Sequence, residues 1–281
     1  MSVRRAFSDF SLAHSIARGE VDPRTGRPRR AQRAYGFSGA GVVALCGSGA
    51  ASGIFSPPSV SSTLVGLYDM ADASTVTHAT TISQVNDKSG AGGSAIGNAT
   101  QPTGGIQPTY DATAINGKPG MVGNGSSTYM YASVALPTDY TVFVVGQLAT
   151  SAATQGLFSS GSAPLSGTPR LIIQQDTTNN WRTFFSAAGY SALNGSSPTA
   201  TPFCATVTYT SGSQGSYYNN VLGSTSAYTA GGSASNCYFL AGYNGYFNGA
   251  IGLVVVYNSV LSSGDRTSVY NAIKSAGWGV P

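Results

Sequence analysis

From residue 64 onward, short runs of β-branched and aromatic residues alternate with clusters of Gly, Asn and Ser. Apolar runs of this length, bounded by turn residues, are typical of β-strands. We expect strands at 64–68, 121–122 with 129–132, 141–147, 156–160, 171–175, 181–185, 203–209, 215–219, 237–241 and 250–257.

The residues between these runs carry strong turn signals. Asn-Gly and Asn-Asn pairs adopt the positive φ angles that tight hairpin turns need. They stand at 116–117, 124–125, 179–180, 194–195, 219–220 and 244–245. Closely spaced strands without helical periods between them predict an all-β, antiparallel jelly-roll sandwich.

One helix is predicted after the last strand. Ser262, with Asp265 three positions later, resembles a capping box at a helix start. Val269 and Ile273 then fall on one apolar side, and Gly277 is a typical helix end.

Residues 1–62 differ in composition and predict a basic, extended N-terminal arm with a short helix, leaving 63–281 as the folded domain. Residues 1–35 hold eight arginines against three acidic residues, a net charge of +5. The remaining residues hold six Lys and Arg against seven Asp, a net charge of −1. All of the excess positive charge therefore belongs to the arm.

The arm is the predicted attachment segment. Phe7 and Phe10 form an apolar stripe on the short helix, which either folds back on the domain or docks into another protein. The near-neutral domain lacks the clustered cations that phosphate binding requires, so nucleic acid is not an expected partner. The residues assigned to partner binding are Arg4, Arg5, Phe7, Phe10, Arg18, Arg24, Arg27, Arg29, Arg30 and Arg33.

Several separated motifs occur together in the domain. They are Leu67 to Ser74 (LYDMADAS), Val85 to Gly90 (VNDKSG), Gln107 to Tyr110 (QPTY), Asn116 to Gly125 (NGKPGMVGNG), Phe247 to Tyr257 (FNGAIGLVVVY) and Gly277 to Val280 (GWGV). In this order they resemble the concanavalin A-like lectin/glucanase superfamily, in particular its laminin-G-like jelly-roll domains. The resemblance covers about residues 64–281 and implies a lectin-like sandwich, a domain frequent in bacteriophage virion proteins.

The chain also departs from that pattern. Asn86 stands where many relatives have Trp, Gly252 where an acidic residue often precedes the last strand, and 123–125 reads Gly-Asn-Gly in place of Phe-Asp-Gly. These changes remove groups that relatives use in polar or metal-linked sites. The inference that this chain shares a binding function with those relatives is therefore weaker than the inference that it shares their fold.

The acidic residues argue against catalysis. Glycosidases of the superfamily use paired carboxylates, typically glutamates on one strand. The single glutamate, Glu20, lies in the arm, and the seven aspartates of the domain include no pair at alternate positions of a core strand. His14 and His78 lack a nucleophile-elbow motif. We therefore expect that the chain is not an enzyme.

Metal and disulfide sites are weakly indicated. Asp69, Asp72 and Asp87 could gather oxygen ligands for Ca²⁺, but hydrogen bonding of backbone at turns is the favoured interpretation, so no cofactor is predicted. The three cysteines have no metal-ligand spacing and leave one residue unpaired in any disulfide scheme. This composition fits assembly in a reducing cytoplasm.

Aromatic residues beside amides are the candidate glycan-binding groups, because rings stack on sugars and amides bind hydroxyls. The alternative is that they are surface or oligomer-contact residues. The candidates are Trp181, Tyr217, Tyr218, Tyr243 and Tyr246.

The function predicted from these features is that of a bacteriophage virion structural protein, assembled in the host cytoplasm. Its arm would bind capsid or tail proteins, and its lectin-like domain would be displayed on the particle, as a homo-oligomer. The alternative is a host-surface polysaccharide-binding adhesin. No export signal is recognised, and the apolar stretch at 41–55 is too short and too rich in Gly and Ser to span a membrane.

Overall fold

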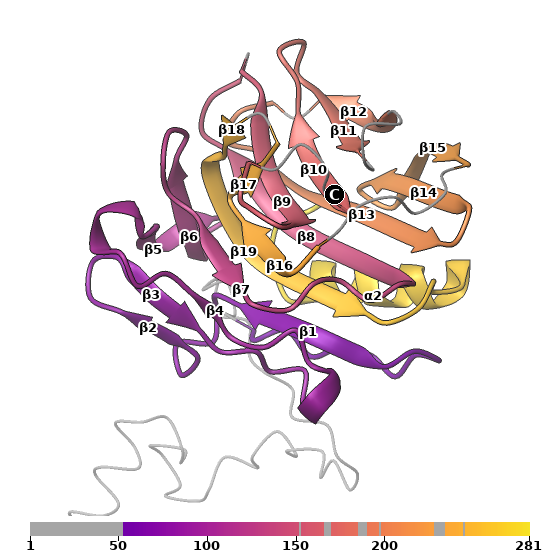
Figure 1. Cartoon of the computed structure of the whole chain (residues 1–281), viewed down its shortest axis with the longest axis horizontal. Helices are drawn as coiled ribbons and strands as arrows, with labels where there is room; N and C mark the ends of the chain where they lie inside the picture. Colours follow the sequence, from indigo (N-terminus) through magenta and orange to yellow (C-terminus); the bar gives the residue numbers. More distant parts are fainter. Residues whose placement is uncertain are drawn as a thin grey trace, which may run out of the picture. The chain divides into compact units, whose positions relative to one another are not determined.

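A computed structural model gives the structure of the chain (Figure 1). The residues that it describes are 53–281, except 152, 166–169, 185–189, 197, 228–233 and 244. The chain divides into two units, Met1–Gly49 and Ala50–Pro281, and the described residues belong to the second. The arm residues assigned to partner binding, from Arg4 to Arg33, lie outside the described part.

Two β-sheets form the domain, and strand β19 lies in the middle of the first. On one side β19 pairs with β8 along its length, and on the other it pairs with β6 and then β1. The order across this sheet is β15 (Val221–Ser226), β14 (Ser213–Tyr218), β13 (Pro202–Thr210), β8 (Tyr140–Leu148), β19 (Asn248–Tyr257), β6 (Lys118–Asn124) and β5 (Thr109–Ile115), with β1 (Leu64–Asp69) beside β19.

The second sheet combines strands from distant parts of the sequence. Its order is β12 (Tyr190–Ser196), β11 (Asn180–Phe184), β10 (Leu171–Gln175), β9 (Gln155–Gly161), β16 (Asn236–Phe239), β7 (Met130–Ala132), β4 (Ala99–Thr100), β3 (Ile82–Val85) and β2 (Val76–His78). A short hairpin of β17 (Ala241–Gly242) and β18 (Gly245–Tyr246) contacts β9 through a parallel pair. Two 3₁₀ helices, Gly92–Ser94 and Gly104–Ile106, lie in the loops.

The main core lies between the sheets, and β8 shows how the sequence produces it. Successive side chains on a strand point to opposite faces. Val142 and Val144 therefore lie in the core between the sheets, whereas Phe143 and Val145 belong to a second apolar cluster. All four are buried. Apolar residues at successive positions thus indicate a strand that is covered on both faces.

The second apolar cluster covers the outer face of the first sheet. Helix α2 (Ser263–Ser275) places Val269 and Ile273 in this cluster, and Ser262 caps its start by accepting a 3.1 Å hydrogen bond from the Asp265 amide. Trp278 packs beside Gly252, where a Cβ atom would lie 2.1 Å from the indole ring. The glycine at this position therefore makes room for Trp278.

The structure confirms the predicted fold class, an antiparallel β-sandwich with a C-terminal helix. The Asn-Gly turn at 116–117 and the Asn-Asn turn at 219–220 join hairpins and have positive φ angles. The turn predicted at 194–195 is wrong, because these residues lie inside β12, at an irregularity between its paired residues Ala192 and Ser196. Strands β2, β3, β4, β5, β12, β15 and β18, which are short or carry weak apolar patterns, were not predicted.

Candidate functional site

Four tyrosines gather on the outer face of the second sheet. Tyr129 and Tyr131 flank Met130 of β7, whose side chain lies in the main core, so both tyrosines point away from it. Tyr238 lies between two core residues of β16, and Tyr246 comes from β18. We call Tyr129, Tyr131, Tyr238 and Tyr246 the tyrosine surface.

The rings of the tyrosine surface contact one another in a row. Tyr131 and Tyr238 are cross-strand neighbours with ring centroids 6.3 Å apart. The Tyr238 and Tyr129 centroids are 6.1 Å apart, and those of Tyr129 and Tyr246 are 6.0 Å apart. These separations lie in the range of interacting aromatic pairs. Tyr238 is buried beneath the row, whereas the other three rings are half-buried.

Neutral polar groups surround these rings. The Asn236 side-chain amide donates a 2.8 Å hydrogen bond to the Tyr238 hydroxyl, and the Gln101 amide donates a 3.1 Å bond to the Tyr129 carbonyl oxygen. Burial raises the pKa of both Tyr238 and Tyr246 above the ordinary tyrosine value. The hydroxyls of Tyr238 and Tyr246 are therefore protonated at neutral pH and can donate as well as accept hydrogen bonds.

Trp181 does not belong to an exposed site, and its assignment as a glycan-binding residue is wrong. Its ring is fully buried in the main core, 4.6 Å from Phe203 and 6.3 Å from Phe247 between centroids. The register of β11 against β10 places Trp181 opposite Gln175 on the inner face. The amides beside it therefore shape a turn and do not flank an exposed ring.

Tyr217 and Tyr218 contact protein groups with their ring faces. The Arg266 guanidinium of α2 lies 3.9 Å from the Tyr217 centroid and donates a hydrogen bond to Asn220. Tyr218 stacks on Phe203 with a centroid separation of 5.8 Å. Both tyrosines are half-buried and join α2 or the core to β14. Each of these contacts occupies one face of the ring concerned.

Of the five sequence candidates, Tyr246 lies in the tyrosine surface and Tyr243 is 44% exposed at the adjoining β17–β18 turn. Tyr129, Tyr131 and Tyr238 were missed. The Tyr-Met-Tyr sequence at 129–131 carried the signal, because two aromatic residues flank an inward methionine with a period of two. No local signal indicates Tyr238, which reaches the group through pairing of β16 with β7.

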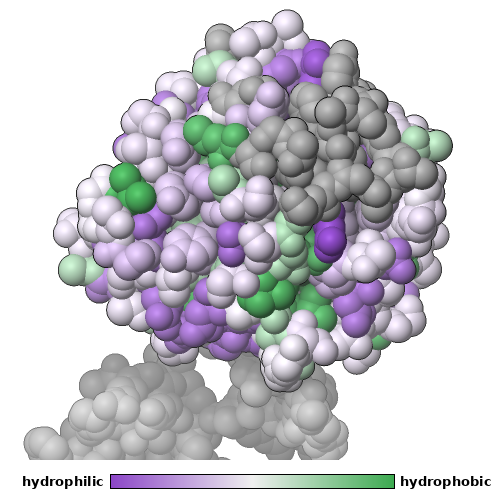
Figure 2. All heavy atoms as spheres, in the orientation of Figure 1, coloured by the Kyte–Doolittle hydropathy of each residue, from purple (hydrophilic) through white to green (hydrophobic). Residues whose placement is uncertain are grey.

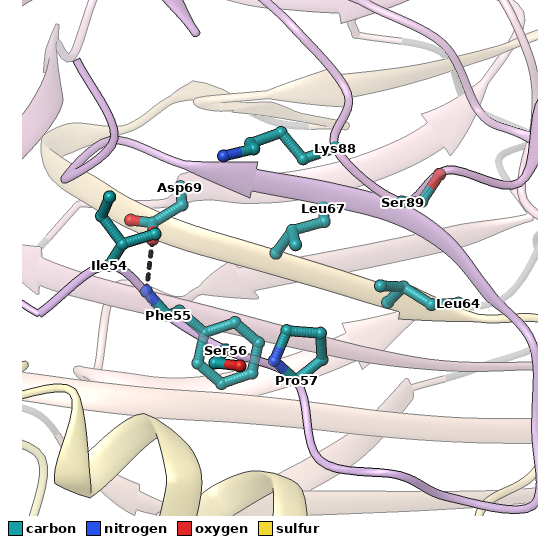
Figure 3. Close-up of a pocket in the computed structure, with 9 residues that line it drawn as sticks. All are labelled: Ile54, Phe55, Ser56, Pro57, Leu64, Leu67, Asp69, Lys88 and Ser89. Atoms are coloured by element: carbon teal, nitrogen blue, oxygen red, sulfur yellow. Dashed lines mark hydrogen bonds between the residues drawn. The ribbon is translucent and has the colours of Figure 1, made fainter. Parts of the chain in front are cut away.

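A second candidate is a pocket beside residues 53–57, which we call the strap (Figure 3). Asp69 accepts a 2.6 Å hydrogen bond from the Phe55 amide, and Lys118 donates a 3.0 Å bond to the Gly53 carbonyl oxygen. The pocket holds about 440 Å³ and is lined by Ile54, Phe55, Ser56, Pro57, Leu64, Leu67, Asp69, Lys88 and Ser89.

The buried charges at the strap act on the protein itself. Burial raises the pKa of Asp69 and lowers the pKa of Lys118, and the two groups partly offset each other's shift. Phe55 is buried in the second apolar cluster. The strap, assigned from the sequence to the arm, thus packs on the sandwich, and its charged neighbours fix its backbone.

The aspartates considered for Ca²⁺ are engaged in the same way. Asp72 pairs with Lys88 and accepts hydrogen bonds from Ser74, and Asp87 accepts backbone amides from three residues. Among the residues described, no three metal-ligating side chains of the His, Cys, Asp and Glu types are grouped to hold an ion. No helix in the same part of the chain is long and apolar enough to cross a membrane.

Comparison with known proteins rests on structure. No protein-family model and no curated protein sequence matches the chain. A sialidase from Trypanosoma rangeli, solved with a difluoro-KDN ligand, superposes with a TM-score of 0.58 at 16% identity, over 76% of this chain and 33% of the sialidase chain. Domain 4 of AbnA, a GH43 extracellular arabinanase from Geobacillus stearothermophilus in complex with arabinotriose, gives a TM-score of 0.54 at 13% identity, over 75% of this chain and 98% of that domain.

These similarities show a shared β-sandwich fold. The chain spans about a third of the sialidase chain and nearly all of the arabinanase domain. They also correct the expectation that the chain is not an enzyme, because glycosidases include chains with this fold. The expectation failed because the arrangement of carboxylates in one set of relatives was taken as a requirement for the whole fold.

Proposed function

We propose that the β-sandwich recognises carbohydrate through the tyrosine surface. The observation that carries this proposal is the group of contacting tyrosine rings on an outer sheet face. Aromatic rings offer apolar faces to the C–H groups of sugars, and phenol hydroxyls bind sugar hydroxyls. The arabinotriose complex of the similar arabinanase domain supports the ligand class.

The direct test compares Tyr131→Ala with the full-length chain on a glycan array, followed by calorimetry with the glycan that binds best. We expect Tyr131→Ala to weaken binding by about tenfold, because one ring face is lost. Tyr110→Ala is the matched control, since Tyr110 is also half-buried but stacks on His78 away from this surface. Equal binding by Tyr131→Ala and the parent chain would refute the proposal.

The same incubations are assayed for released reducing sugars, because the fold is shared with glycosidases. Release that requires the folded domain would add cleavage to recognition. Thermal melting of each variant verifies that its fold is intact, so that a binding loss is assigned to the surface.

We further propose that this domain belongs to a bacteriophage virion protein, whose residues 1–49 attach it to capsid or tail proteins while the sandwich contacts host polysaccharide. The segregation of charge supports this, with +5 in residues 1–35 and −1 in the rest. Deletion of residues 1–49 leaves the strap and sandwich in place. We expect the shortened chain to bind glycan but to be absent from purified particles, and its incorporation would refute the attachment role.

A further inference from the structure

The tyrosine surface also indicates the class of carbohydrate. Resting on the proposed function, we infer that its ligand is an uncharged, extended polysaccharide chain that lies across the half-buried rings of Tyr131, Tyr129 and Tyr246, above the buried Tyr238. The alternative within the same function is an acidic sugar, of the kind named in one of the sialidase complexes as sialic acid. Charge and shape distinguish the two.

Charge argues for a neutral ligand. Recognition of a sugar carboxylate uses Arg or Lys, which form charge-assisted hydrogen bonds. Within the described residues, the hydrogen bonds and ring contacts of these four tyrosines involve no Asp, Glu, Lys, Arg or His side chain.

The Lys and Arg side chains of the domain contact other groups, away from the tyrosine surface. Lys88 pairs with Asp72, Arg182 pairs with Asp176, and Lys118 lies buried at the strap. Arg170 donates to the carbonyl oxygens of two loop residues. Arg266 and Lys274 lie over aromatic rings at α2. These six account for every Lys and Arg after residue 35.

The wider surface has the same character. Figure 2 shows one face of the molecule that is mainly white to pale violet, with both strongly hydrophilic and hydrophobic patches on it. This agrees with a chain in which charged residues make up 9% of the sequence. Long-range attraction of an acidic polymer to the sandwich is therefore weak, since it needs an extended positive potential.

Shape argues for a chain of several sugars. Tyr131 and Tyr129 stand two residues apart on one face of the chain at β7, and Tyr246 of β18 adds a third ring with its centroid 6.0 Å from that of Tyr129. The ring planes of Tyr131 and Tyr129 are inclined by 40° and 60° to that of Tyr238, and the planes of Tyr129 and Tyr246 are inclined by 25° to each other. A single sugar covers one ring face, whereas successive sugars of a chain can follow the changing inclination, so affinity should rise with ligand length.

The hydroxyl groups complete the recognition. The Tyr238 hydroxyl accepts a hydrogen bond from the Asn236 side-chain amide, which fixes this buried ring beneath the three half-buried ones. Protonated phenols and amides both donate and accept, which matches the hydroxyl groups of a neutral sugar. A carboxylate can only accept hydrogen bonds. The free energy that it would lose on leaving water is larger than neutral hydrogen-bond donors on this surface would return.

The test uses the full-length chain and calorimetry with four probes, arabinan and mixed-linkage β-glucan as neutral polymers and polysialic acid and polygalacturonate as acidic ones. We expect at least one neutral polymer to bind with an affinity that changes less than about twofold between about 50 and about 500 mM NaCl, because no charge is involved. Oligosaccharides of the bound polymer should gain about tenfold in affinity from one to about four sugars.

Tyr131→Ala and Tyr131→Phe separate the surface from the basic residues 1–35. Neutral binding that is lost in Tyr131→Ala and retained in Tyr131→Phe supports the inference. Acidic binding that falls with salt and is lost in Tyr131→Ala would overturn the neutral class while the proposed function stands. If neither neutral nor acidic binding changes in Tyr131→Ala, both the proposed function and the neutral-ligand inference fail. Equal affinity for one sugar and for four sugars would refute the extended ligand.

Discussion

Replacement of Trp181 by alanine should reduce stability rather than remove a ligand contact. The indole is fully buried against Phe203 and Phe247. A buried indole removes about 200 Å² from water, which at about 25 cal/mol per Å² corresponds to about 5 kcal/mol. Measured Trp→Ala changes in cores cost about 3–5 kcal/mol, so we expect a loss of about 4 kcal/mol. This is a large part of the stability of a typical domain, about 5–15 kcal/mol.

Guanidinium chloride unfolding measures this loss. Trp278 is the second of the two tryptophans and is buried, so its fluorescence still reports unfolding of Trp181→Ala. Tyr243→Ala is the surface control and should stay within about 0.5 kcal/mol of the parent chain. An unchanged midpoint in Trp181→Ala, together with lost glycan binding, would refute the buried placement and restore Trp181 as a ligand contact.

Three further predictions concern other parts of the domain. In the full-length chain carrying Cys46→Ser, Cys204 and Cys237 should not react with a thiol reagent at about pH 8 until the chain unfolds, because burial raises the pKa of each to about 12; labelling of the native state would contradict this. Ser262→Ala should lower the free energy of unfolding by about 1 kcal/mol through loss of the α2 cap, while Ser262→Asp should retain it. The hydrogen bond from Lys88 holds the pKa of Asp72 below its ordinary value, so this pair contributes stability above about pH 4 that is lost as the pH falls through the lowered pKa. The free energy of unfolding of Lys88→Met should therefore be lower than that of the parent chain by under about 1 kcal/mol at neutral pH, and this difference should shrink in acid. A difference that grows in acid would show that the Lys88–Asp72 pair does not stabilise the fold in this way.

The strands that sequence predicted best are those covered on both faces or rich in β-branched residues. β8, β13 and β19 have long apolar runs, because both the main core and the α2 side bury them. β12 and β15 carry Ser, Gly and Asn, and local propensity gave no strand there. Pairing with neighbouring strands determines both, and the turn-favouring Asn194 and Gly195 lie at an irregularity between the paired residues Ala192 and Ser196 of β12.

The candidate site was harder to predict than the fold. Tyr246 was selected from an Asn-Gly context, and Tyr129 and Tyr131 could have been found from the period-two pattern around Met130. Tyr238 could not, because it joins the others only through the register of β16 on β7. Trp181 was assigned to a glycan site because amide side chains stand beside it in the sequence. That assignment was wrong because neighbours in sequence do not determine which sheet face a residue occupies.

The sequence by itself determined the sandwich class, the capped C-terminal helix and the separation of a cationic segment from a nearly neutral domain. These follow from local periodicity, capping residues and charge counts, which short segments carry on their own. Tertiary structure decided that Trp181 is buried, that Gly252 makes room for Trp278, and that four tyrosines from three strands form one surface. The physical reason is that strand alternation defines two faces, whereas long-range pairing and packing decide which face is covered and which neighbours share it.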